Sequence, residues 1–123
     1  MIAARHGYAE CIHILYKYYG DQFDINITNL RQHTALILAV SNNHPNCIQM
    51  LYDCFGDEMN IDQVDYHNHN AMMIAIFRNR IECVQKLYEC FGNKAIFYTH
   101  KQKGYSIIKL LLDKSQYQLL QLL

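Results

Sequence analysis

Apolar residues recur along this chain at a fixed interval of 36 positions. The strictest series repeat one residue type three times, as in Ala3, Ala39 and Ala75; Cys11, Cys47 and Cys83; Leu15, Leu51 and Leu87; Tyr16, Tyr52 and Tyr88; and Gly20, Gly56 and Gly92. A period in this range indicates stacked supersecondary units, each too small to bury its own apolar face. The spacing predicts one domain over residues 1–123, divided into a partial unit at 1–28, units at 29–64 and 65–100, and a partial terminal unit at 101–123.

Within a unit, the pattern predicts two helices followed by a polar connector. In the second unit, Thr34 stands before the short apolar run 35–40 and can cap a helix by accepting a hydrogen bond from a backbone N–H. Pro45 suits the first turn of a second helix, and Gly56 suits its end because glycine tolerates a left-handed conformation. The Asp- and Asn-rich stretch 57–70 then predicts a short extended hairpin.

The recurring positions also predict the core. We expect these side chains to be buried: Ala39, Cys47, Ile48, Leu51, Ala75, Val84 and Leu87. The chain has five cysteines and no visible secretory signal, which favours reduced thiols inside a cell. No two cysteines have the close spacing of a structural zinc site. We therefore expect Cys11, Cys47 and Cys83 to be reduced, buried and metal-free.

At Thr34-Ala35-Leu36-Ile37-Leu38-Ala39 the chain resembles the ankyrin motif T-P-L-H-x-A, and Asn70-Ala71-Met72-Met73-Ile74-Ala75 repeats it. The resemblance implies an all-α solenoid of stacked helix–turn–helix repeats with short β-hairpin-like connectors. The period of 36 exceeds the family's period of about 33, and we expect the extra residues to lengthen the corner at 55–60. A tetratricopeptide solenoid fits less well, because it has two long helices and almost no extended connector.

Little in the sequence indicates chemistry. Eleven basic residues balance eleven acidic ones, which argues against nucleic-acid or membrane-surface binding by the whole chain. Five of the basic residues are lysines within 93–123, where Asp113 is the only acidic residue; this end is either simply solvated or a basic patch for an acidic partner. His33, His67 and His69 leave a surface metal site open as an alternative, but no carboxylate or thiol is fixed beside them by spacing. We expect no catalytic residue, no cofactor and no metal.

The ankyrin resemblance implies a module that binds a partner protein through its concave face. An acidic or His-compatible protein segment is the expected partner. We expect neither nucleic acid nor membrane as a partner, and we expect an intracellular, cytoplasmic location. The alternative is a structural or regulatory segment of a longer ankyrin protein, with an enzyme domain elsewhere. Apolar ends, including 119–123, also lead us to expect self-association or a need for neighbouring units. Carried over from the family, the contact positions are Arg5, His6, Arg31, His33, Ser41, Asn42, Tyr66, His67, His69, Phe77, Arg78, Lys103 and Tyr105.

Overall fold

The computed structural model describes residues 1–92, 94 and 95, and the expected terminal unit at 101–123, with Lys103 and Tyr105, lies outside them. The described elements are α1 (Ile2–His6), α2 (Ala9–Tyr19), the 3₁₀ turn η1 (Gly20–Gln22), α3 (Ala35–Ser41), α4 (Pro45–Phe55), the 3₁₀ turn η2 (Gly56–Glu58), α5 (Ala71–Phe77) and α6 (Ile81–Phe91). None of these helices is long and apolar enough to cross a bilayer. The described part is all-α, as predicted, and contains no β-strand.

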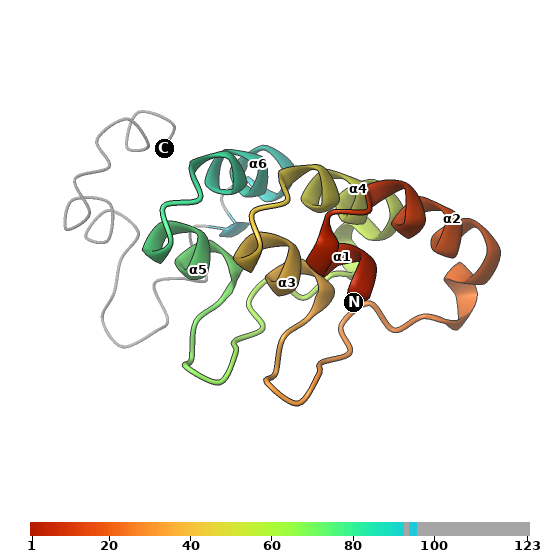
Figure 1. The fold of residues 1–123 in the computed structure, drawn as a ribbon, viewed down its shortest axis with the longest axis horizontal. Coiled ribbons are helices and arrows are strands. Elements are labelled where there is room, and N and C mark those ends of the chain that lie inside the picture. Colours follow the sequence, from red (N-terminus) through yellow and green to blue (C-terminus); the bar gives the residue numbers. More distant parts are fainter. Residues whose placement is uncertain (93, 96–123) are drawn as a thin grey trace.

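The helices form two parallel rows. The short helices α1, α3 and α5 make the inner row, and the longer helices α2, α4 and α6 make the outer row (Figure 1). Each helix packs against its equivalent in a neighbouring unit and against its partner in its own unit. The connectors before α3 and α5 project away from the inner row as two loops that lie side by side (Figure 1). This arrangement places the inner row and the two loops on one surface of the stack.

Local signals in the sequence start and stop the inner helices. The Thr34 hydroxyl accepts a hydrogen bond from the backbone N–H of Ile37 at 3.2 Å, and the Asn70 side chain does the same for Met73 at 2.9 Å. The cap predicted at Thr34 is thus present, and it satisfies a backbone donor that the first turn would otherwise leave unpaired. With only seven residues each, α3 and α5 depend on tertiary packing for stability, and every residue of α3 is buried.

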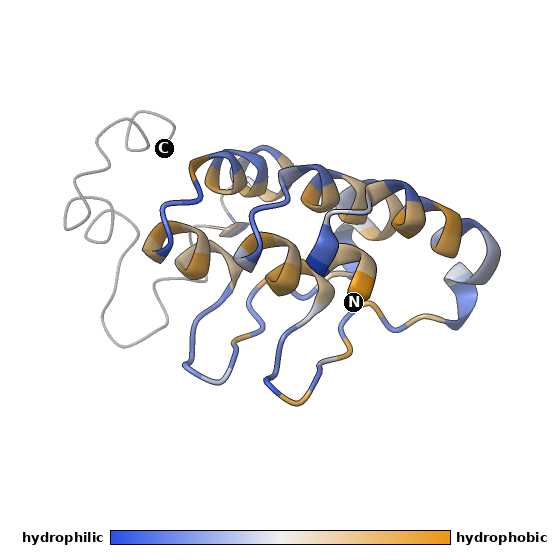
Figure 2. Cartoon of the chain, in the orientation of Figure 1, coloured by the Kyte–Doolittle hydropathy of each residue, from blue (hydrophilic) through white to orange (hydrophobic). Residues whose placement is uncertain are grey.

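The core lies between the two rows, and all seven of the predicted core residues are buried in it. Figure 2 shows apolar segments of the helices turned toward this interior and hydrophilic segments turned outward. Equivalent aromatic pairs join successive units edge to face: Tyr16 meets Phe55 at 5.1 Å between ring centroids, and Tyr52 meets Phe91 at 5.3 Å. The 36-residue period is therefore the period of one repeated interface.

The corner after each outer helix accommodates the long period. After α4, η2 adds a 3₁₀ turn and delivers Met59 into the core. The side-chain amide of Asn26, in the preceding unit, fixes this corner by donating to the Glu58 carbonyl at 2.9 Å and accepting from the Asn60 N–H at 2.7 Å. Gly56 ends α4 with φ +50°, a backbone angle that residues with a side chain rarely adopt. This is expected for a glycine at the end of a helix.

The first unit departs from the prediction. Cys11 is exposed, although Cys47 and Cys83 at equivalent positions are fully buried. Leu15 is 41% exposed, whereas Leu51 is 2% exposed. The physical reason lies in the repeated interface, where a thiol at this position packs against the preceding unit, as Cys47 does against the Ala3 carbonyl. In the described structure nothing covers that side of the first unit, so Cys11 and Leu15 are exposed.

Candidate partner-binding surface

The two projecting loops are built in the same way. In the first, the Asn29 side-chain oxygen accepts hydrogen bonds from the backbone N–H groups of Arg31 and His33 at 2.9 and 3.0 Å. In the second, Asp65 Oδ1 accepts from His67 and His69 at the same two distances. A backbone hydrogen bond closes each loop, from Asn29 to His33 and from Asp65 to His69. These are Asx-type turns, so one short polar side chain shapes each loop and presents its tip residues to solvent.

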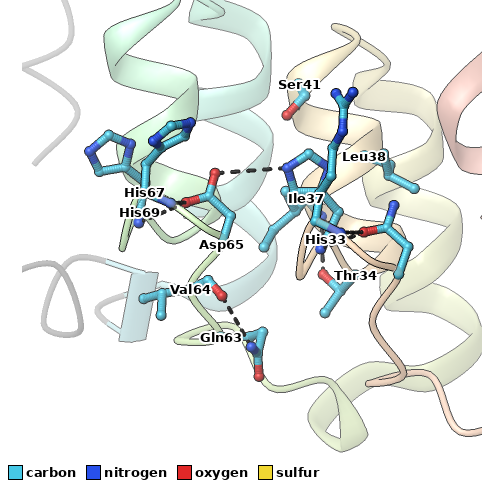
Figure 3. Close-up of polar contacts among 12 residues, drawn as sticks. His33, Thr34, Ile37, Leu38, Ser41, Gln63, Val64, Asp65, His67 and His69 are labelled. Carbon is cyan, nitrogen blue, oxygen red and sulfur yellow. Dashed lines mark hydrogen bonds and ion pairs between the residues drawn. The ribbon is translucent and has the colours of Figure 1, made fainter.

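Asp65 also links the two loops. Its side chain is buried, and Oδ2 lies 3.8 Å from His33 Nε2 across the gap between successive units (Figure 3). Burial lowers the pKa of His33 below its usual 6.5, the Asp65 carboxylate opposes this effect, and Arg31, Arg78 and Arg5 add to it. Three arginines from three parts of the chain therefore act on one histidine.

The tip of the second loop carries an aromatic cluster. The His67 and His69 rings lie 6.2 Å apart, and the His69 ring lies 4.8 Å from that of Phe77 in α5. Phe77, one of the predicted contact positions, is half-buried rather than exposed, because the His69 ring and the core cover part of it. Within the described residues, no three His, Cys, Asp or Glu side chains gather closely enough to hold a metal ion.

Beside the first loop, the inner row is hollowed into a depression of about 520 Å³. Its walls carry Arg5 from α1, Arg31 from the loop and Arg78 from just beyond α5. The other lining residues are Asn29, Leu30, His33, Leu38, Ser41 and Asn42. Among the residues that the structure describes, the lining therefore includes no acidic side chain, and it gathers three permanent positive charges.

The remaining predicted contact residues divide into two groups. His6, Asn42 and Tyr66 are exposed, as a contact surface requires. Ser41 is only 8% exposed, so its side chain offers little surface to a partner, although the residue lines the depression. It lies on the last turn of α3, where its carbonyl accepts a hydrogen bond from Arg78 Nη1 at 3.3 Å.

Sequence reasoning missed three residues of this surface. Leu30 is 98% exposed at the tip of the first loop, at the position equivalent to Tyr66, which is 72% exposed. Asn29 and Asp65 shape the loops and are also 36 residues apart. The repeat register contained this signal, because comparing the two connectors position by position pairs Asn29 with Asp65 and Leu30 with Tyr66.

The family comparison agrees with this geometry. The family model described as ankyrin repeats, in three copies, matches residues 1–96. The chain belongs to the ankyrin repeat family. Ankyrin repeats are generally protein–protein interaction modules, and domains built from them are typically non-catalytic. Among curated proteins, none matches the chain.

Proposed function

We propose that this ankyrin domain is a non-catalytic module that binds a segment of an acidic partner protein across the surface formed by α1, α3, α5 and the two loops. The observation that carries the proposal is the set of exposed side chains on the two loop tips, Leu30, Arg31 and Tyr66, which none of the repeated packing positions requires. Aromatic and arginine side chains are the types that most often dominate binding energy at protein interfaces. A solvated loop would have no need of a fully exposed leucine.

The charge on this surface favours an acidic partner. Residues 1–92 contain six basic and ten acidic residues, yet three of the six basic residues line the depression beside the first loop. Opposite charge on a partner would speed association and fix its register. Affinity should therefore weaken as salt rises, because exposed charges are screened.

The test replaces Leu30, Arg31 and Tyr66 together with Ala. We expect this triple variant to lose its captured partners while its melting temperature stays close to that of the unaltered protein, since all three side chains are exposed. Phe77 is left intact because its half-buried ring would confound the result. The matched control replaces Ile14, Lys17 and Tyr18 with Ala, an exposed aliphatic, basic and aromatic set on α2 in the outer row.

Partners captured by the unaltered domain are compared with those captured by both variants, and the affinity of any partner so identified is then measured by calorimetry. Retention of the same partners at full strength by the Leu30, Arg31 and Tyr66 variant would contradict the assignment of this surface. Equal loss in the control would do the same.

A further inference from the structure

The three arginines of the depression beside the first loop indicate a more specific ligand than an acidic partner in general. We propose that the depression is a binding site for the phosphoryl group of a phosphorylated peptide segment. This inference deepens the proposed function and rests on it, since the peptide would lie on the same surface. The site consists of Arg5, Arg31 and Arg78, with His33 at its edge.

The first argument is the convergence of charge. Arg5, Arg31 and Arg78 come from three successive parts of the chain, and all three act electrostatically on His33. Among the described residues, none of the three forms an ion pair with a carboxylate. Like charges brought together without counter-ions repel one another and oppose folding. An anion bound among the three arginines would remove this repulsion, so the arrangement favours anion binding.

The second argument is the position of the nearest acidic group. Asp65 does not line the depression, because Oδ1 accepts two backbone hydrogen bonds within its own loop and Oδ2 faces His33. Its carboxylate is therefore committed to the loop and to the histidine. In the described part of the chain, no acidic side chain compensates the three arginines on the side that faces solvent.

The third argument concerns the shape of the anion. A carboxylate has two coplanar oxygens and pairs best with one guanidinium fork. A phosphoryl group carries a charge of about −1.5 to −2 and three acceptor oxygens pointing in different directions. Three guanidinium groups that line the depression from α1, the loop and the end of α5 suit three acceptor oxygens better than one planar carboxylate. Arg78 is partly oriented in advance, since Nη1 donates to the Ser41 carbonyl while the guanidinium has four further N–H donors.

The fourth argument indicates a peptide rather than a free ion. Leu30, 98% exposed, stands at the rim of the same depression, and Leu38 lines it as well. A free phosphate makes no use of an apolar rim. A peptide chain carrying the phosphoryl group would cover Leu30 with its neighbouring side chains, removing an apolar side chain from water.

The test uses two probes on the whole chain. Inorganic phosphate is titrated into the protein while amide resonances are followed by NMR, and degenerate peptide libraries centred on phosphoserine, glutamate or serine are compared by fluorescence polarisation. We expect phosphate to shift resonances of residues 29–33, 41, 42 and 78. We expect the phosphoserine library to bind at least about tenfold more tightly than the glutamate library.

Arg31→Gln and Arg78→Gln should each weaken phosphoserine-library binding by about tenfold or more, the size of one lost charge-assisted hydrogen bond. Arg31→Gln should not lower the melting temperature, because it removes a like-charge repulsion. Arg78→Gln removes the same repulsion but also the hydrogen bond to the Ser41 carbonyl, so its melting temperature should change only slightly. Lys17→Gln is the matched control, since it removes one positive charge from α2, outside the depression, and should leave binding unchanged.

Equal binding of the glutamate and phosphoserine libraries would overturn the inference, as would phosphate shifts located outside the depression. Competition by a single-stranded oligonucleotide as strong as by the phosphopeptide would also overturn it and assign the arginines to nucleic acid. Loss of partner capture in the Leu30, Arg31 and Tyr66 variant without any phosphate site would leave the proposed function standing alone. If phosphate binds in the depression but the Leu30, Arg31 and Tyr66 variant captures its partners unchanged, the proposed function is wrong. The same result would show that the phosphoryl group does not come from a peptide.

Discussion

At the residue scale, Asp65 has two separable roles. Its Oδ1 shapes the second loop by accepting two backbone hydrogen bonds, and its charge opposes the lowering of the His33 pKa. The first loop shows how to separate them, because Asn29 makes the same pair of backbone hydrogen bonds with a neutral side chain. The first loop therefore indicates that Asn can replace Asp65 and keep both backbone hydrogen bonds.

We predict that Asp65→Asn keeps the loop and lowers the His33 pKa further, since the neutral amide no longer favours the imidazolium. A lowered folded-state pKa contributes stability above the unfolded value of 6.5, and that contribution is lost as pH falls below it. The variant should therefore lose more stability on acidification than the unaltered protein. NMR titration of His33 and urea unfolding above and below pH 6.5 measure both effects.

Two comparisons complete this test. Asp65→Ala should cost about 1–3 kcal/mol at any pH, because two loop N–H groups lose their acceptor. Asp62→Asn makes the same charge change in the same connector without touching the Asp65–His33 pair and serves as the control. A His33 pKa that rises in Asp65→Asn would refute the assignment.

The cysteines give a second prediction at this scale. Cys11 is exposed, Cys47 and Cys83 are buried, and burial raises the pKa of the Cys83 thiol to about 11. At pH 8, about one Cys83 thiol in a thousand would be ionised, so both its access and its nucleophilicity are poor. We expect Cys11 to react first with a thiol reagent under native conditions, measured by mass spectrometry of the modified peptides. Cys11→Ser should remove that fast phase, and modification of Cys83 at the same rate would contradict the fold.

Part of the site could be predicted at this scale. The family resemblance placed Arg31, His67 and Tyr66 among the contact positions, and all three are exposed on the loops. It gave no sign that Ser41 is buried, at 8% exposure, or that its carbonyl accepts a hydrogen bond from Arg78 Nη1. Such a contact depends on a long side chain from the adjacent unit, which a one-dimensional pattern does not encode.

At the element scale, the sequence predicts those helices whose start, end and apolar face are set by residues within one repeat unit. Helices α3 to α6 follow from the apolar period, the Thr34 cap and the glycine stop, all of which are local. The turn η2 was predicted only as a longer corner at 55–60 and η1 was not predicted, because a 3₁₀ turn has no strong apolar pattern. Gly20 shows the limit of local signals: it has helical dihedral angles, unlike Gly56 and Gly92 at equivalent positions.

The equivalence of units makes a stability prediction with an internal control. Leu51 in α4 is 2% exposed and Leu15 in α2 is 41% exposed, although both occupy the same position of the repeat. Leu51→Ala should cost about 2–5 kcal/mol of unfolding free energy, because it opens a cavity in the core. Leu15→Ala should cost clearly less, since its side chain already contacts water. Equal losses in urea unfolding would contradict the difference in burial.

At the scale of the whole molecule, stacking leaves one side of the first unit uncovered in the described structure. We call this the bare face and define it by Cys11, Leu15, Tyr19 and Phe23, all exposed. Equivalent positions in the second unit, Cys47, Leu51, Phe55 and Met59, are all buried. The bare face therefore has the composition of an inter-unit interface but is open to water.

An interface-like apolar face open to water favours association, because burying it removes apolar surface from solvent. We predict that residues 1–123 self-associate through the bare face with a second copy, and that sedimentation velocity shows a concentration-dependent mass. Replacing Tyr19 and Phe23 with Lys should yield a monomer, since two like charges would be buried against the partner. Replacing the exposed Leu30 and Tyr66 with Lys makes the same charge change on the loop tips and should leave association intact. A monomer at every concentration, or dissociation by the loop-tip control, would show that the bare face is not the contact.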